Sequence, residues 1–176
     1  WYYAVGSRII YGGGIPGPGL GDVVVAQTEL YVHTPCASLS PPPPPSPLSP
    51  PSPNAPSSST CRVLISRQTV VIGSTSWLRE DAEWSINPHD PSAAQFSILD
   101  QLEGMGRSSD GDNKFLFELY WPDLEGSPKG PRQMWKQTSN PVTAVKGAAV
   151  SGYEAVDAPY TGQYWGGLQR SHSAAL

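Results

Sequence analysis

The sequence predicts a mainly β protein: an antiparallel β-sandwich or jelly roll with at most one short helix, joined to a polyproline II segment. Its 176 residues include 18 Gly, 20 Pro, six Trp and eight Tyr, and only 15% are charged. That composition is typical of short strands and frequent turns rather than of a helix bundle. Apolar stretches separated by turn signals recur along the chain, and only one stretch has helical spacing.

The clearest strand has Thr28, Leu30 and Val32 alternating with Glu29 and Tyr31, so the two sets should lie on opposite faces of a sheet. A second strong strand places four large apolar side chains on one face: Phe115, Phe117, Leu119 and Trp121. The expected strands are residues 1–6, 22–32, 62–66, 69–72, 114–121, 135–138, 150–156 and 164–168.

A short helix is expected after the turn at residues 87–92. Asp90 is a candidate N-cap, with Pro91 at the first helical position. Phe96, Leu99 and Leu102 would then face the core at three-residue spacing. The helix should end at one of the two glycines that follow.

Residues 40–56 contain ten of the 20 prolines. Proline fixes φ and has no backbone donor, so this stretch is neither a helix nor an inner strand. Its expected form is polyproline II, which at about 3.1 Å per residue extends roughly 50 Å.

Cys36 and Cys61, the only cysteines, bracket the proline-rich segment. A bridge between them within the chain removes roughly 3 kcal/mol of denatured-state entropy and makes the segment an arch. Pairing with a neighbouring subunit is the alternative.

Charge and hydropathy exclude several partners. The formal net charge is −4 and Lys and Arg do not cluster, which argues against nucleic acid. No apolar run has the length of a membrane span. The chain starts at Trp1 without Met, so we expect a processed or partial chain. Two cysteines beside a Ser/Pro tract favour an extracellular disulfide.

Several phrases together resemble a secreted domain of extracellular and skeletal organic matrix-type proteins from invertebrates, protists and algae. They cover most of residues 62–176, and the resemblance implies no catalytic residue set. The phrases are Asn-Pro-His-Asp-Pro-Ser (87–92), Phe-Ser-Ile-Leu-Asp-Gln-Leu (96–102), Phe-Glu-Leu-Tyr-Trp-Pro (117–122), Trp-Lys-Gln-Thr-Ser-Asn-Pro-Val (135–142), Gly-Tyr-Glu-Ala-Val-Asp (152–157) and Trp-Gly-Gly-Leu (165–168).

In that family, pieces like residues 1–7, 14–18 and 29–32 follow the Trp-Gly-Gly-Leu block, whereas here they come first. The resemblance therefore implies three parts. Residues 1–35 are closing strands of a β domain that complete a neighbouring domain, residues 36–61 are the Pro/Ser-rich segment, and residues 62–176 are the main body of the β domain. Apolar, strand-like ends support this independently, because such edges pair with other chains.

The Ser/Pro segment resembles hydroxyproline-rich wall glycoproteins of algae and plants, of the extensin and pherophorin kind. This resemblance implies hydroxylated prolines with O-linked sugars, and O-glycosylation of serines. An unmodified spacer is the alternative. The implied sites are Pro41, Pro42, Pro43, Pro44, Pro45, Pro47, Pro50, Pro51, Pro53 and Pro56, with Ser40, Ser46, Ser49 and Ser52.

Other candidate sites have simpler explanations. Asp110, Asp112 and Asn113 carry oxygen ligands of the kind that calcium uses, but no closing glutamate follows and turn chemistry explains them. Trp77 and Trp84 are candidates for stacking on sugars, although large aromatic side chains more often fill cores or interfaces.

No nucleophile elbow, metalloprotease motif or phosphate loop is present in the sequence. Glu80, Asp81 and Glu83 suit a solvated run better than a glycosidase pair. We therefore expect no enzyme and no cofactor. The function expected is an extracellular structural glycoprotein protomer that assembles head to tail with copies of itself into a matrix or filament. The alternative is a lectin-like carbohydrate-binding module on a proline-rich stalk.

Overall fold

A computed structural model describes residues 26–36, 60–69, 84–108, 110–159 and 167–170. The expected strand at 1–6, the proline-rich segment, Trp77, the acidic run near it and most of 164–168 lie outside these residues. The described elements are strands β1 (Gln27–Pro35), β2 (Thr60–Thr69), β3 (Ser85–Ile86), β4 (Gln95–Ile98), β5 (Phe115–Tyr120), β6 (Arg132–Gln137) and β7 (Glu154–Asp157), with 3₁₀ helices η2 (Leu99–Met105) and η3 (Pro122–Leu124).

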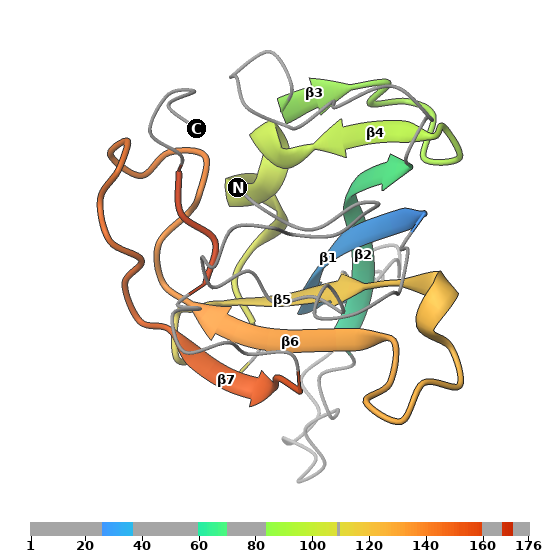
Figure 1. Ribbon diagram of the computed structural model, residues 1–176. Helices are drawn as coiled ribbons and strands as arrows, with labels where there is room; N and C mark the ends of the chain where they lie inside the picture. The colour runs from blue at the N-terminus through green and yellow to red at the C-terminus, as the bar shows by residue number, and fades with distance from the viewer. Residues whose placement is uncertain (1–25, 37–59, 70–83, 109, 160–166, 171–176) are drawn as a thin grey trace, which may run out of the picture.

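The seven strands form one antiparallel sheet in the order β3-β4-β2-β1-β5-β6-β7 (Figure 1). The predicted mainly antiparallel β class is therefore confirmed. β1 lies in the middle of the sheet, between β2 and β5 of the same chain. β3 and β7 are the outermost strands, at the top and bottom of Figure 1.

The predicted faces of β1 are confirmed. Leu30 lies opposite Leu119 of β5, and Val32 lies opposite Phe117. These apolar side chains are at most 1% exposed, so β1 is part of the core and not an edge. Along β2 the register shifts opposite Leu30 and Tyr31, which leaves Ile65 as the extra residue of a β-bulge.

The core lies on one face of the sheet. Phe117 and Trp135 stack there with ring centroids 5.6 Å apart. η2 contributes Leu99 and Leu102, and both side chains are buried. All four apolar side chains predicted to share a face of residues 115–121 are fully buried. Burial of each large apolar side chain contributes about 1.5–3 kcal/mol to the stability of the folded state.

The predicted helix start is wrong. Gln95–Ile98 forms strand β4, and only Leu99–Met105 is helical, as a 3₁₀ helix. The carboxylate of Asp90 accepts hydrogen bonds from the backbone N–H and the hydroxyl of Ser92, so it closes a local turn instead of capping a helix. Pairing of β4 with β2 then satisfies the backbone groups that a helix would have used.

Several strand boundaries also differ from expectation: β1 continues to Pro35, and β6 begins at Arg132, three residues before the expected start. Residues 62–66 and 69 belong to one continuous strand, because Arg67 and Gln68 pair on both sides, with β1 and with β4. In the region expected as residues 150–156, only the part from Glu154 onward is a strand. Arg67 and Gln68 are polar, so in the sequence they resemble a turn between two strands, although both lie within β2.

The predicted disulfide between Cys36 and Cys61 is present within the chain, with a Cα–Cα distance of 4.9 Å. The bridge lies at the end of the β1–β2 pair, where Thr34 is opposite Cys61. The two ends of the proline-rich segment are thus fixed side by side at one end of two central strands.

Two glutamines of β6 point into the core and differ in their partners. The Gln137 amide oxygen accepts from Trp135 Nε1 (2.9 Å) and Leu168 N (2.8 Å), and its nitrogen donates to carbonyl oxygens of Ser139 and Leu168. Gln133 is equally buried, but neither atom of its amide has a partner among the described residues. An unpaired buried amide costs about 1–3 kcal/mol.

This contrast predicts that the same substitution has very different effects on the free energy of unfolding at the two positions. Gln137→Leu should lower the free energy of unfolding by about 3 kcal/mol, because it leaves Trp135 Nε1 and Leu168 N unpaired in the core. Gln133→Leu should change it by less than about 1 kcal/mol or raise it. Urea unfolding followed by Trp fluorescence measures both. Equal losses at the two positions would contradict the assignment.

Candidate functional site

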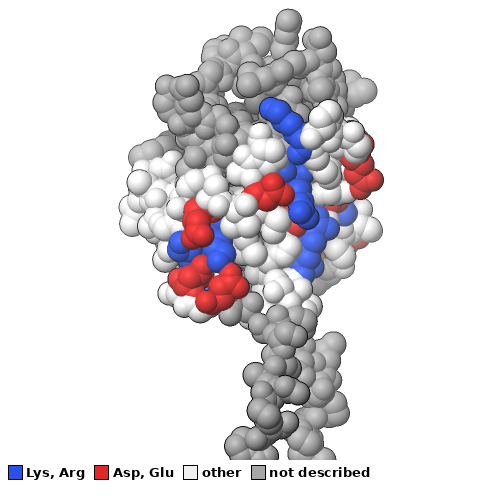
Figure 2. Space-filling view, turned by 90° about the horizontal axis from the view of Figure 1, so that it is seen from below, with Lys and Arg blue, Asp and Glu red and all other residues white. Residues whose placement is uncertain are grey.

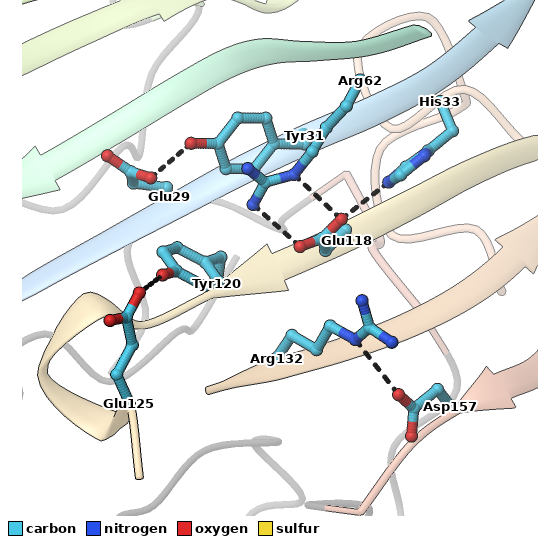
Figure 3. Close-up of polar contacts among 9 residues, drawn as sticks. All are labelled: Glu29, Tyr31, His33, Arg62, Glu118, Tyr120, Glu125, Arg132 and Asp157. Atoms are coloured by element: carbon cyan, nitrogen blue, oxygen red, sulfur yellow. Dashed lines mark hydrogen bonds and ion pairs between the residues drawn. The ribbon is translucent and has the colours of Figure 1, made fainter. Parts of the chain in front are cut away.

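The outer face of β1 carries a polar network that joins the three central strands. Alternation along β1 places Glu29 and Tyr31 on the face opposite the core, as the sequence predicts, and His33 follows them on the same face. The neighbours β2 and β5 add charged and aromatic side chains to the same face (Figure 3). We call this network the β1 clamp, and it consists of Glu29, Tyr31, His33, Arg62, Arg67, Glu118 and Tyr120.

Glu118 of β5 is the centre of one half of the clamp. Its side chain is 4% exposed and accepts from Arg62 Nη2 (2.8 Å), Arg62 Nε (3.1 Å) and His33 Nε2 (2.7 Å). Burial by itself would raise the pKa of Glu118. Hydrogen bonds from His33 and Arg62 outweigh burial, so the pKa lies below its ordinary value. The carboxylate therefore stays charged and ties β5 to β1 and β2.

Arg62 connects this carboxylate to two aromatic rings. Its guanidinium carbon lies 3.4 Å from the centroid of the Tyr31 ring and 4.9 Å from that of Tyr120. The two tyrosines meet edge to face, with centroids 6.4 Å apart. An arginine held over aromatic rings while it bonds a carboxylate in two places has its orientation fixed. The Tyr120 hydroxyl in turn donates to Glu125 beyond η3 (Figure 3).

Glu29 of β1 is the centre of the other half. It is 4% exposed and binds Arg67 of β2 at 2.8 Å. The Tyr31 hydroxyl and the Gln27 amide donate to the same carboxylate. Burial, together with the hydrogen bond and negative charge of Glu29, raises the pKa of Tyr31 to about 12. Each of the two nearly buried carboxylates of the clamp is thus matched by an arginine from β2.

This arrangement suits strand recognition. The acidic groups of the clamp are bound by its own basic groups and hydroxyls, and the partners come from three different strands. Charge pairing across an interface fixes register and disfavours wrong partners more than it adds raw stability. The clamp therefore favours β1, in its observed register, as the strand between β2 and β5.

A second charged cluster lies over β6 and β7. Lys136 Nζ is 2.5 Å from Asp110 Oδ2 and 2.8 Å from Asp112 Oδ2, while Lys114 pairs with Glu154 at 2.7 Å. The hydrogen bonds that Lys136 donates to Asp110 and Asp112 raise its pKa. In Figure 2 basic and acidic side chains likewise lie in adjacent groups, and the surface in view is not of a single sign.

The calcium candidate falls in this second cluster. The ammonium of Lys136 bridges Asp110 and Asp112, and Asn113 adopts a left-handed turn conformation with φ 57°. A positive charge is therefore already bound by both carboxylates. Among the described ranges, no three His, Cys, Asp or Glu side chains are grouped to hold a metal ion.

Trp84 is half-buried and packs against the core. The Arg170 guanidinium carbon lies 5.0 Å from its ring centroid, so the ring has a cation for a neighbour. Tyr31, Tyr120 and Arg62 were not predicted as site residues from the sequence. Alternation placed Tyr31 on the outer face, but only the strand order brings the other two to it.

Comparison with protein-family models, with curated proteins and with solved structures found no match. Within the part of the chain that the structure describes, no helix has the length and apolar character needed to cross a membrane.

The clamp predicts a large difference between two ion pairs. Glu118→Gln should lower the free energy of unfolding by about 2 kcal/mol, because Arg62 and His33 lose a nearly buried carboxylate. Arg132→Gln, which removes an exposed pair with Asp157 at 3.3 Å, is the control and should cost less than about 1 kcal/mol. Chemical denaturation of both variants measures the two losses in free energy of unfolding. Similar losses would show that the Glu118 contacts stabilise the fold no more than an exposed ion pair does.

The same carboxylate gives the clamp a pH dependence. A carboxyl whose pKa is lower in the folded chain stabilises the fold above its unfolded pKa of about 4.3, and that contribution is lost as the pH falls through the lower folded value. The stability difference between the wild type and Glu118→Gln should therefore be full near pH 6 and shrink below about pH 4. A constant difference across this range would contradict a charged Glu118.

Proposed function

We propose that this chain is an extracellular structural glycoprotein protomer that assembles head to tail with copies of itself into a matrix or filament. The observation that carries the proposal is the Cys36–Cys61 bridge, which joins the two ends of a Ser/Pro-rich segment at one end of the central strands. Disulfides persist in oxidising compartments, which supports secretion. The bridge allows the segment to present its prolines and serines without lengthening the β body.

The composition of the segment supports its modification. Prolines without backbone donors form a solvated polyproline II chain whose side chains are open to modifying enzymes. We propose that hydroxylated prolines and serines of residues 40–56 carry O-linked glycans. The sugars would coat the assembly, while the β bodies form its continuous part.

The sheet supports self-assembly through its strand order. Its central strand comes from the N-terminal side of the proline-rich segment, and both neighbours of that strand come from the C-terminal side. Strands that lie on the two sides of a long linker can belong to one copy or to two adjacent copies. A head-to-tail contact of this kind does not close and produces an open chain of subunits.

A carbohydrate-binding module is the second candidate. The half-buried rings of Tyr31 and Tyr120 on the outer face favour it, since aromatic rings stack on sugars. The guanidinium of Arg62 over the Tyr31 ring counts against it, because a bound sugar would have to displace that contact. Binding to a glycan array that is lost in Tyr120→Ala would favour the module over the structural protomer.

Secretion of the chain from plant or algal cells tests the structural proposal. We expect negative-stain images to show open chains of subunits, and mass spectrometry to find hydroxylation and pentose or hexose additions within residues 40–56. The matched control replaces the ten prolines of the segment with Ser at equal length and should lose the proline-linked sugars. Single particles at every concentration, together with an unmodified segment, would refute the proposal.

A further inference from the structure

The connection between β1 and β2 is unlike that of an ordinary hairpin. The two strands pair over nine registered positions, yet Cys36 and Cys61 at their ends are 25 positions apart in sequence. Antiparallel neighbours need only two to five connecting residues. The sheet itself therefore does not require so long a connection.

The place of β1 between β2 and β5 is specific for β1. On the core face, Leu30 and Val32 are at most 1% exposed between the two neighbours. On the outer face, Arg62 and Arg67 of β2 bind Glu118 and Glu29, and His33 also binds Glu118. A second copy carries an identical β1. That strand would satisfy the same apolar and charged partners without any new surface.

The connection is also long enough for exchange between copies. As polyproline II, the residues between the two cysteines reach roughly 75 Å at about 3.1 Å each. A domain of this size is about 40 Å across. A proline-rich chain resists sharp reversal, so an open form in which β1 lies in a neighbour relieves the bend that the closed form requires.

We propose that the Cys36–Cys61 bridge is the lock on this exchange. Closed within one chain, it keeps β1 in its own sheet, as in the structure. Closed between chains, it makes the head-to-tail assembly covalent. The register of β1 against β2 determines which cysteine Cys36 meets, because Thr34 pairs with Cys61 and Pro35 with Thr60. Any docked β1 delivers its own Cys36 to the Cys61 of the chain that supplies β2. The lock rests on the proposed head-to-tail assembly.

Conversion from the closed to the linked form needs no net oxidation. The thiolate of a small thiol such as glutathione attacks one sulfur of the bridge and releases the other as a thiolate. After β1 moves to a neighbour, the released thiolate attacks the mixed disulfide that the neighbouring chain carries. A new bond forms between Cys36 and Cys61, and the glutathione thiolate leaves. Each new bond between chains releases one glutathione thiolate, so no oxidant is consumed. In an open chain of subunits, one mixed disulfide and one free thiol remain at the two ends.

Two single-cysteine chains test the lock. A donor chain, Cys61→Ser, keeps only Cys36, and an acceptor chain, Cys36→Ser, keeps only Cys61, so neither forms the internal bridge. The two are mixed at full length with oxidised glutathione, which takes up the two electrons and two protons of each new bond. We expect a donor–acceptor dimer on non-reducing gels, with the Cys36–Cys61 peptide pair identified by mass spectrometry.

One further substitution separates strand exchange from random collision of thiols. Val32 is fully buried on β1, so Val32→Asp prevents that strand from docking. In the donor it should reduce the linked dimer more than about tenfold. In the acceptor, Val32→Asp keeps the acceptor's own β1 from docking between β2 and β5. The donor's β1 then has no competitor, so the yield of linked dimer should rise. Val156→Asp in the donor, the same change at a half-exposed position on β7, is the matched control and should leave the yield within about twofold of its value without the substitution.

The outcomes distinguish the lock from the assembly. A yield that does not respond to Val32→Asp in the donor would overturn the lock, because collision would then explain the bond. Open chains of wild-type subunits seen by electron microscopy in that case would leave the proposed structural function standing. If the acceptor carrying Val32→Asp does not fold alone, recovery of its circular dichroism on mixing with the donor still reports docking, and no recovery counts against the lock.

Discussion

The position of β1 between β2 and β5 is the constraint on which the rest of the structure depends. Its core face buries Leu30 and Val32 against the other strands. Its outer face supplies Glu29 to Arg67 of β2 and His33 to Glu118 of β5. Without β1, the sheet would divide into β3-β4-β2 and β5-β6-β7, each with an unpaired inner edge. The apolar layer and the charged clamp therefore both depend on the same nine residues.

The sequence predicted what lies on each face of single strands. Alternation was sufficient to separate Thr28, Leu30 and Val32 from Glu29 and Tyr31, because a strand has a fixed period of two. It did not predict which strands are neighbours. Arg62 and Glu118 are 56 residues apart in sequence, and only the strand order places them across β1. The clamp was therefore not predictable from local pattern.

The elements that differ from their predictions do so for one physical reason. Phe96, Leu99 and Leu102 have helical spacing, yet Phe96 lies on a strand that continues directly into a 3₁₀ helix. Arg67 and Gln68 resemble a break between strands, yet they pair on both sides. In each case tertiary pairing outweighed a short local signal, which propensity over three or four residues cannot anticipate.

The disulfide at the end of β1 also determines how the molecule bears tension. At the other end of this strand, Asp123 accepts hydrogen bonds from the backbone N–H groups of Ala26 and Gln27. A pull on the chain at Ala26 would shear β1 along both neighbours, so that its ladder bonds are loaded together and not one at a time. Force that reaches Cys36 crosses directly to Cys61 through the sulfur bond. The covalent path for that force therefore runs from β1 to β2 through two sulfur atoms.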